Sequence, residues 1–309
     1  MAKKTWITGD FHGELFRFHN FVEILSRLNE KPEDTNIVCL GDCGFNFFLN
    51  KSDQKRKKAA NSFGFTFYCV RGNHEERPEN IPTMTLVYDE EVKNCVYMES
   101  EYPNIRYLVD GEVYEFEKKQ CLVIGGAYSV DKWYRLKRAN LNEETNNPKI
   151  TGWFSSEQLD LVEREIILKK IKGKEYDMVF THTCPISWEP KDTFLRQIDQ
   201  TTVDKTMENW LKEVANNIDF KVWCFGHYHR DRAERRNAQM FYQDIFPLLD
   251  IYNNTIAREK APGYDNQSFQ LCPKCGNICF KREGTDPRYY CNWCHSEFYL
   301  VVKNDKIIL

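Results

Sequence analysis

Carboxylate, imidazole and amide side chains gather in five short segments of this chain. The segments are Asp10-x-His12, Gly41-Asp42, Gly72-Asn73-His74-Glu75, His182 and Gly226-His227-x-His229. They contain five of the seven histidines, which leaves only His19 and His295 elsewhere. Such ligands suit a pair of borderline cations, Mn, Fe or Zn, rather than Ca or Mg alone. The sequence therefore predicts a site for two divalent metal ions.

Each segment follows a short apolar run that predicts a buried strand. The runs are residues 5–8, 37–40, 66–70, 178–180 and 222–225. Helical spacing of apolar residues from Leu15 to Leu28, and a basic helix over 52–63, separate the first three runs. This order predicts a parallel α/β core. Open α/β sheets bind ligands at the carboxyl ends of their strands, where these segments lie. A single loop histidine is usually solvated, and a single strand-end aspartate often caps a helix; five such segments together favour a site.

The sequence also predicts elements that carry no candidate metal ligands. Short strands at 105–109, 113–116 and 121–124 suggest a second, antiparallel part of the sheet system. Ser155 is predicted to cap a helix that runs to about Lys170. Residues 253–270 contain Asn, Pro and Gly and predict a linker between a domain at 1–252 and a small one at 271–309. Four consecutive cations are expected to form a solvated helix face: Lys55, Arg56, Lys57 and Lys58.

Composition limits the class of protein. The 309 residues carry a formal charge of -3, so no global attraction to nucleic acid or membrane follows. The N-terminus reaches Gly9-Asp10 without an apolar segment, and no run is long enough to span a membrane. We expect a cytoplasmic, reducing location and no membrane partner. Most of the 12 cysteines are expected to be small hydrophobic residues in apolar runs, among them Cys39, Cys69, Cys121 and Cys224.

Four further cysteines form two C-x-x-C pairs separated by 15 residues. They are Cys272, Cys275, Cys291 and Cys294. Four thiolates at this spacing predict a closed tetrahedral site for one structural zinc ion, in the pattern of a zinc ribbon. Lysines, arginines and aromatic residues nearby would suit a nucleic acid or protein partner. A stabilising appendage with ordinary surface charge explains them equally well, and both interpretations stay open.

The order of the five segments resembles the calcineurin-like metallophosphoesterases over about residues 5–250. The resemblance implies a four-layer α/β/β/α sandwich that holds two metals. It implies that the first metal is bound by Asp10, His12 and His229, and the second by Asn73, His182 and His227. Asp42 would bridge the two, and His74 would stay off the metals and face the leaving group. His74 and Asp42 are therefore the expected catalytic residues.

Two cations in such a site can clamp the attacking and leaving oxygens of a displacement at phosphorus. His74 would then act as general acid or stabilise negative charge on the phosphoryl group.

The chain departs from one branch of the family. Protein Ser/Thr phosphatases continue the second segment as Gly-Asp-x-Val-Asp-Arg-Gly, which supplies an Asp that orients the catalytic His and a phosphate-binding Arg. Here Asp42 is followed by Cys43-Gly44-Phe45-Asn46, so both residues are missing. By proximity to the motifs, Arg71, Arg77 and Arg230 could bind phosphate, although packing or surface roles are commoner.

Three functions follow from these residues. A phosphomonoesterase, in part like the protein phosphatases, is preferred. The alternatives are a phosphodiesterase or nuclease aided by the ribbon, and a catalytically silent binding module. The substrate would be recognised by loops at 45–52, 128–150 and 184–200. The tract from Tyr128 to Asn140 would border the cleft or form an ordinary surface loop.

Overall fold

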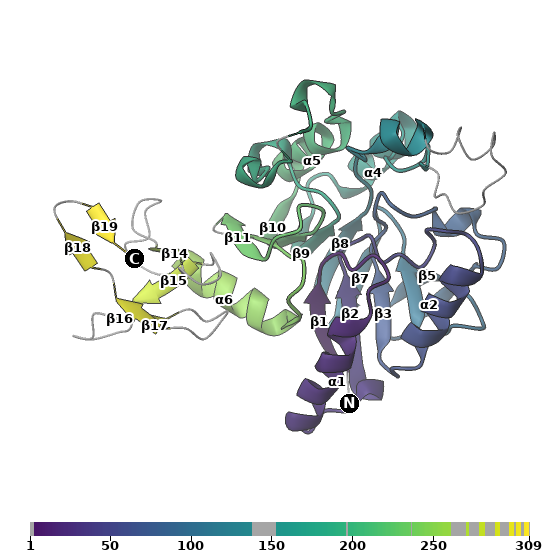
Figure 1. Ribbon diagram of the computed structural model, residues 1–309, viewed down its shortest axis with the longest axis horizontal. Helices are drawn as coiled ribbons and strands as arrows, with labels where there is room; N and C mark the ends of the chain where they lie inside the picture. Colours follow the sequence, from purple (N-terminus) through teal and green to yellow (C-terminus); the bar gives the residue numbers. More distant parts are fainter. Residues whose placement is uncertain are drawn as a thin grey trace.

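The computed structural model describes residues 3–137, 153–195, 197–235 and 237–260, and short C-terminal strands from residue 270 to 308. Two mixed sheets lie face to face, and helices cover their outer faces (Figure 1). Within the described residues, no helix is both long enough and apolar enough to cross a membrane.

The first sheet has seven strands in the order β13-β1-β2-β3-β6-β5-β4. Their bounds are β1 Lys4–Thr8, β2 Thr35–Cys39, β3 Thr66–Cys69, β4 Thr85–Asp89, β5 Asn94–Met98, β6 Ile105–Leu108 and β13 Phe246–Pro247. Strands β1, β2, β3 and β6 are parallel, in a register that aligns Ile7 with Val38 and Val38 with Tyr68. Strands β4, β5 and β13 pair antiparallel. The parallel part therefore places the ends of β1, β2 and β3 at one edge.

The second sheet has six strands in the order β11-β12-β10-β9-β8-β7. Their bounds are β7 Val113–Phe116, β8 Lys119–Ile124, β9 Glu175–Thr181, β10 Asp219–Phe225, β11 Arg232–Arg235 and β12 Ala238–Met240. Strands β8, β9, β10 and β12 are parallel, whereas β7 and β11 are antiparallel. The expectation that 105–124 forms an antiparallel part is thus only partly right. Strands β6 and β8 each have one parallel neighbour, because each joins the parallel core of its own sheet.

Alternation along the strands sorts side chains into three cores. Ile37 and Cys39 of β2 face the outer helices, whereas Val38 and Leu40 face the other sheet. The core between the sheets combines residues of both, such as Tyr68 and Phe180. The outer helices are α1 Phe16–Arg27 and α2 Lys51–Asn61 on the first sheet, and α4 Leu161–Ile171 and α5 Thr206–Asn217 on the second. The four-layer α/β/β/α sandwich is confirmed.

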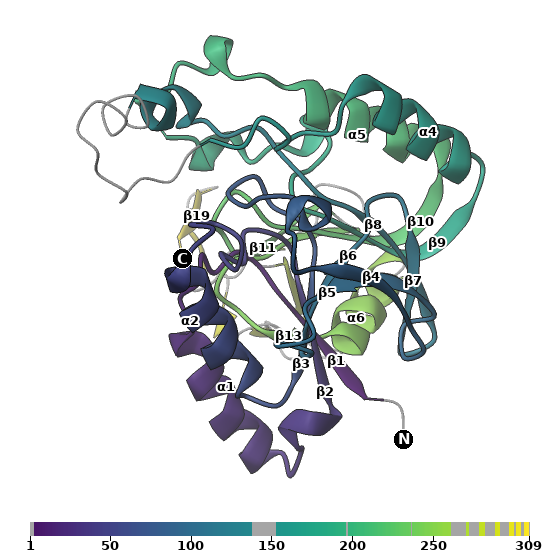
Figure 2. The same cartoon turned by 90° about the vertical axis from the view of Figure 1, so that its right-hand side faces the viewer.

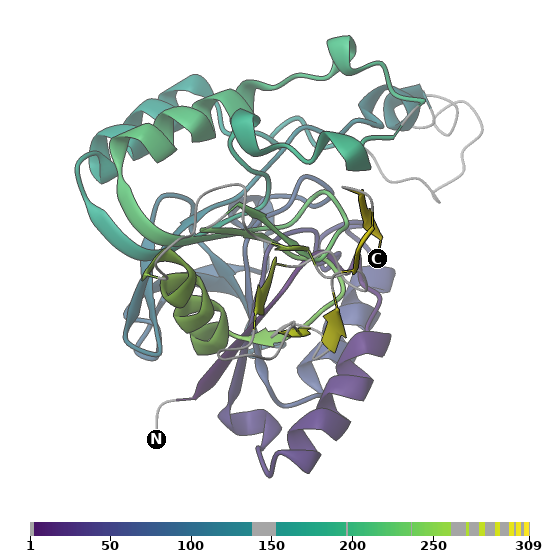
Figure 3. The same cartoon turned by 90° about the vertical axis from the view of Figure 1, so that its left-hand side faces the viewer.

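Figures 2 and 3 show the two outer helix layers from opposite directions, with α1 and α2 on one side of the sheets and α4 and α5 on the other. Helix α6, Leu248–Lys260, packs against β1 and β10 and contributes Leu248 and Ile251 to the core between the sheets. Short 3-10 turns complete the connections: η1 Pro32–Asp34, η2 Pro78–Asn80, η3 Ile186–Trp188, η4 Lys191–Thr193 and η5 Gln200–Thr202.

Two predicted boundaries are wrong. The helix expected to begin after Ser155 begins at Leu161, because Asp160 accepts the backbone N–H of Glu163, whose side chain accepts that of Asp160 in turn. Residues 253–260, expected to be linker, are the second half of α6, since Tyr252 and Thr255 are buried and extend its apolar face.

The C-terminal strands fall into two small antiparallel sheets. β14 Gln270–Leu271, β15 Ile278–Lys281, β16 Arg288–Tyr290 and β17 Glu297–Tyr299 form one, and β18 Val301–Lys303 pairs with β19 Lys306–Ile308. The zinc-ribbon pattern also predicts strands at 278–281, 289–290 and 298–302, near three of these places. Cys272, Cys275, Cys291 and Cys294 lie outside the described residues, so the zinc ribbon stays a prediction.

The basic helix α2 is not uniformly solvated. Lys57 is buried, and its Nζ lies 2.5 Å from Oε2 of Glu99, which is also buried and accepts a hydrogen bond from Thr83. Lys58, its neighbour in sequence, is exposed. Because a buried charge requires a partner, this pair fixes α2 to the β5–β6 connection.

We predict that Lys57→Met destabilises the protein by about 3–5 kcal/mol, because it leaves the Glu99 carboxylate buried without its cation. Urea unfolding followed by circular dichroism measures the change. Lys58→Met, on the same helix, is the control and should cost less than about 0.5 kcal/mol. Equal stability of the two variants would contradict the assignment of a structural ion pair.

Candidate functional site

The five polar segments meet at one edge of the sandwich. Three follow β1, β2 and β3 of the first sheet, and two follow β9 and β10 of the second. Because these strands are parallel within each sheet, their carboxyl ends face the same edge. The structure thus brings together side chains that lie more than 200 residues apart in the sequence, such as His12 and His229, whose Nε2 atoms are 3.2 Å apart.

Two buried carboxylates form the centre of the site. Asp10 and Asp42 are 0% and 2% exposed. Asp10 accepts the backbone N–H of His227 at 3.0 Å, and Asp42 accepts that of His74 at 2.8 Å. Burial alone would raise the pKa of Asp42, but His74, His182 and His12 lower that pKa far below its usual range. Both carboxylates are therefore charged at neutral pH.

One group of ligand atoms comes from Asp10, His12 and His229, which lie within 4.8 Å of one another. Nε2 of His229 is 3.4 Å from Oδ2 of Asp10. Burial opposes the charged imidazole, but the hydrogen bond to Asp10 raises the pKa of His229. A cation bound here would displace that proton, because a ligating imidazole must be neutral.

A second group contains Asp10, Asp42 and His182, again within 4.8 Å. Nδ1 of His182 lies 2.8 Å from the backbone oxygen of Leu40, so this nitrogen donates. Nε2 of His182 lies 2.8 Å from Oδ1 of Asn73, whose Nδ2 donates to Ser129. In the neutral imidazole Nε2 is an acceptor, and it then faces a second acceptor. Two facing acceptors fit a divalent cation held between them.

His227 completes this side of the site. Its ring centroid is 5.0 Å from that of His182. Burial and the neighbouring His182 lower the pKa of His227 to about 3, so the ring is neutral and available as a ligand at neutral pH.

The backbone is strained at four of the expected ligands. His12, Asp42, His227 and His229 have φ values of 47°, 44°, 69° and 53°. Residues other than Gly rarely adopt this left-handed backbone conformation, and such strain concentrates at functional sites. The surrounding sheet edges hold these turns and aim the side chains at one centre.

Glycines make room for this crowding. A Cβ on Gly72 would lie 2.0 Å from Oδ1 of Asp42, and one on Gly41 would lie 2.0 Å from Nδ1 of His182. Neither distance is possible for real atoms. The glycines of the second and third segments are therefore required for the ligand side chains to approach the strand ends.

The comparisons with known proteins bear directly on this geometry. The family model described as calcineurin-like phosphoesterase matches residues 3–231, about three quarters of the chain. This chain belongs to the calcineurin-like phosphoesterase family. Among solved structures, one aligns with a TM-score of 0.42 and 13% identity, over 78% of this chain and 90% of that one. A comparison with curated proteins finds no significant match.

The family assignment makes the protein a metal-dependent phosphoesterase. Its members bind two divalent metals, and the two groups of carboxylates and imidazoles fit such a pair. All seven residues predicted as ligands, together with His74, line this edge of the phosphoesterase domain. Which residue binds which metal stays a prediction.

The sequence predicted Arg135 only as part of a tract that could border the cleft, but the structure places it at the site. Arg135, in the helical stretch 132–137, donates from Nη2 to Nδ1 of His74 and stacks over the Phe47 ring at 5.2 Å. Nε of Arg135 is 2.7 Å from Asp131. Burial and the Arg135 guanidinium lower the pKa of His74, against the opposing effect of Asp42. No sequence motif marks this residue, because it belongs to none of the five segments.

The three arginines that sequence proximity suggested as phosphate ligands fall into two groups, two structural residues and one at the cavity. Arg71 is 1% exposed and donates to Asp110 and to the backbone oxygen of Glu157. Arg77 pairs with Glu163. Both hold the 154–163 segment against the first sheet. Arg230 is exposed and lines the cavity beside the metal ligands.

Glu75, the last residue of the third segment, has a role that its sequence position did not reveal. Its Oε1 accepts the backbone N–H of Gly72 at 3.2 Å and of Cys43 at 3.3 Å, and its Oε2 accepts from Tyr107 at 2.6 Å. The carboxyl group thus joins the second and third segments behind the ligands.

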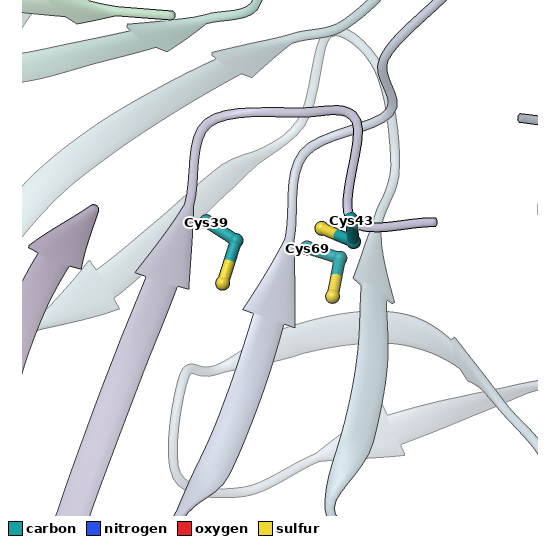
Figure 4. Close-up of side chains that lie close together, drawn as sticks. All are labelled: Cys39, Cys43 and Cys69. Carbon is teal, nitrogen blue, oxygen red and sulfur yellow. The ribbon is translucent and has the colours of Figure 1, made fainter. Parts of the chain in front are cut away.

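Three buried cysteines lie behind the same two segments, near the ends of β2 and β3 (Figure 4). The sulfur atoms of Cys39, Cys43 and Cys69 are within 4.8 Å of one another. Cys39 and Cys69 are aligned across β2 and β3. All three pack among the aromatic side chains of the outer core, which agrees with the expectation of small hydrophobic residues for Cys39 and Cys69.

A cavity of about 350 Å³ opens beside the metal ligands. Its lining includes Asp42, Asn73, His74, His227 and His229, together with Thr193, Phe194, Leu195, Ile198, Gln200, Val203 and Lys205. A volume near this size accommodates a small organic molecule. The predicted loops 128–150 and 184–200 both contribute residues to it.

We predict that Gly72→Ala lowers the number of metal ions bound per chain below two, because the added Cβ displaces the Asp42 carboxylate. Metal content after dialysis, measured by mass spectrometry, gives the number. Gly64→Ala is the control, because a Cβ at Gly64 would meet only Pro32, at 3.4 Å. That variant should keep the metal content of the parent. Two bound metals in Gly72→Ala would show that Asp42 is not a ligand.

Proposed function

We propose that this protein is a dinuclear phosphomonoesterase. Asp10, His12 and His229 would hold one divalent cation and Asn73, His182 and His227 the other. Asp42 would contact both. The observation that carries this proposal is the pair of acceptor atoms that face each other at 2.8 Å, Nε2 of His182 and Oδ1 of Asn73.

The bound cations would supply Lewis acidity and activate water for attack on phosphorus. Mn, Fe and Zn all suit imidazole and carboxylate ligands. The chain's own residues then decide which ester is bound and how the developing charge is stabilised.

Cationic and donor groups beside the ligands support a monoester. Arg135 contacts His74, and Arg230 lines the cavity. A phosphomonoester dianion carries one more negative charge than a diester, so each additional cation favours the monoester over the diester. This argument favours monoester hydrolysis over the nuclease alternative, which depends on the predicted zinc ribbon.

His74 acts as a hydrogen-bond donor in this proposal. Because an Arg135 N–H occupies Nδ1, the proton of the neutral ring is on Nε2. That N–H would donate to a phosphoryl oxygen or to the leaving oxygen as charge develops there. Of the two roles expected for His74, stabilisation of charge is therefore favoured over proton donation.

The function is tested with p-nitrophenyl phosphate and bis-p-nitrophenyl phosphate in the presence of added Mn. We expect faster hydrolysis of the monoester, and loss of activity on both esters in Asp42→Asn. A preference for the diester would replace the monoesterase with a phosphodiesterase. No activity on either ester, with two metals bound per chain, would favour a silent binding module.

We predict that Arg135→Gln lowers kcat for p-nitrophenyl phosphate by about 10²–10³-fold, in the range found when one donor that stabilises transition-state charge is removed. Metal content should not change, because Arg135 contacts no expected ligand. Lys137→Gln, an exposed cation two residues away, is the control. An unchanged kcat in Arg135→Gln would remove Arg135 from the mechanism.

A further inference from the structure

We infer that the cavity beside the metals binds the leaving group of the substrate and selects an aromatic alcohol that carries an N–H or O–H donor. The inference rests on the proposed phosphoesterase function and names its substrate class. Three features of the cavity carry it: its apolar wall, its fixed aromatic ring and a buried carboxylate oxygen without a partner.

Apolar residues predominate in the cavity lining outside the expected ligands, among them Tyr128, Val130, Phe194, Ile198, Val203 and Tyr228. Polar residues such as Thr193, Gln200 and Arg230 complete it. The polar atoms of the phosphate would lie at Asp42, Asn73 and His74, which line the same cavity. A phosphate ester bound there would place its organic part against the apolar wall. Burial of an apolar ring favours binding by about 25 cal/mol per Å².

Two aromatic rings of this wall are held parallel. Phe194 and Tyr228 have centroids 6.2 Å apart and planes that differ by 20°. The Tyr228 hydroxyl lies 3.0 Å from Oγ1 of Thr183, and Tyr228 stands between His227 and His229 in sequence. The ring is therefore fixed relative to two expected metal ligands. A flat substrate ring gains most from such a preorganised aromatic surface.

Glu208 supplies the polar contact. It lies on α5, is 2% exposed and lines the cavity. Its Oε1 accepts from Oγ1 of Thr183 at 2.9 Å, whereas Oε2 has no hydrogen-bond partner among the described residues. Lys205, the cation one turn earlier, pairs with Glu189 at 2.7 Å instead. An orphaned buried carboxylate oxygen is costly, and a ligand donor that enters the cavity as far as the enclosed Oε2 of Glu208 would remove that cost.

These features together disfavour phosphate esters of two kinds of alcohol. A small aliphatic alcohol leaves the aromatic wall uncovered. An aromatic alcohol without a donor leaves the Glu208 oxygen unpaired, which is the stronger form of discrimination.

The experiment compares 3-aminobenzyl phosphate with 3-methylbenzyl phosphate, and both with glycerol 2-phosphate. The two benzyl esters have nearly equal size and similar leaving groups, so their kcat/KM ratio reports the donor. We expect the parent protein to prefer the amino ester by at least about 10-fold and either benzyl ester over glycerol 2-phosphate.

In Glu208→Gln and Glu208→Leu, the ratio of kcat/KM for the amino ester to kcat/KM for the methyl ester should fall toward one. Glu213→Gln, an exposed glutamate on the same helix, should keep the parent ratio. Phe194→Ala, which leaves Glu208 in place, should reduce the preference for benzyl esters over glycerol 2-phosphate and keep the donor preference.

A parent ratio near one, with all three esters hydrolysed, would overturn this inference and leave the proposed phosphoesterase intact. An unchanged ratio in a folded Glu208→Gln variant would overturn the role of Glu208. Failure to hydrolyse any monoester, with p-nitrophenyl phosphate also inert, would instead overturn the proposed function on which the inference rests.

Discussion

Two charged carboxylates, Asp10 and Asp42, are buried at the edge where two sheets meet, and the rest of the site follows from the need to stabilise them. Removing a carboxylate from water is costly unless positive charge or donors replace the lost hydration. Here backbone N–H groups of His227 and His74 and a ring of imidazoles surround them. If divalent cations bind here, the ligating imidazoles must be neutral, and the cations supply the positive charge that the carboxylates require.

The surrounding structure maintains that costly arrangement. Left-handed turns at His12, Asp42, His227 and His229 aim the ligands inward. Glycines 41 and 72 keep the strand ends clear, and the Glu75 carboxyl ties the second and third segments together from behind. The apolar cores on both faces of each sheet hold the strand ends in register, so strain at the turns is offset by burial elsewhere.

Groups outside the metal-binding segments give the site its individual character. The second segment lacks the Asp and Arg that protein phosphatases carry there, whereas the structure places Asp131 and Arg135 beside His74. Glu208 of α5, together with Phe194, Ile198 and Val203, lines the cavity. The edge that carries the expected ligands is therefore joined to a pocket built by residues outside the five segments.

The sequence by itself determined the parallel α/β core and the types of the candidate ligands, because both are local features of the sequence. The four-layer sandwich was implied by the resemblance to the family. Buried strands appear in the sequence as apolar runs. Each run ends in residues such as Gly72-Asn73-His74, whose ability to bind a metal ion is evident without knowledge of their spatial neighbours. Helix ends were harder to predict: Ser155 and Asp160 both offer a capping side chain, and in the structure the capping box forms between Asp160 and Glu163. The environments of Lys57, Glu75, Arg135 and Glu208 were decided by tertiary structure alone. Each of them has a hydrogen-bond partner in another segment of the chain, 25 to 61 residues away in sequence. The sequence does not distinguish a charged side chain that faces water from one that pairs with a buried partner, because that difference depends on the tertiary structure.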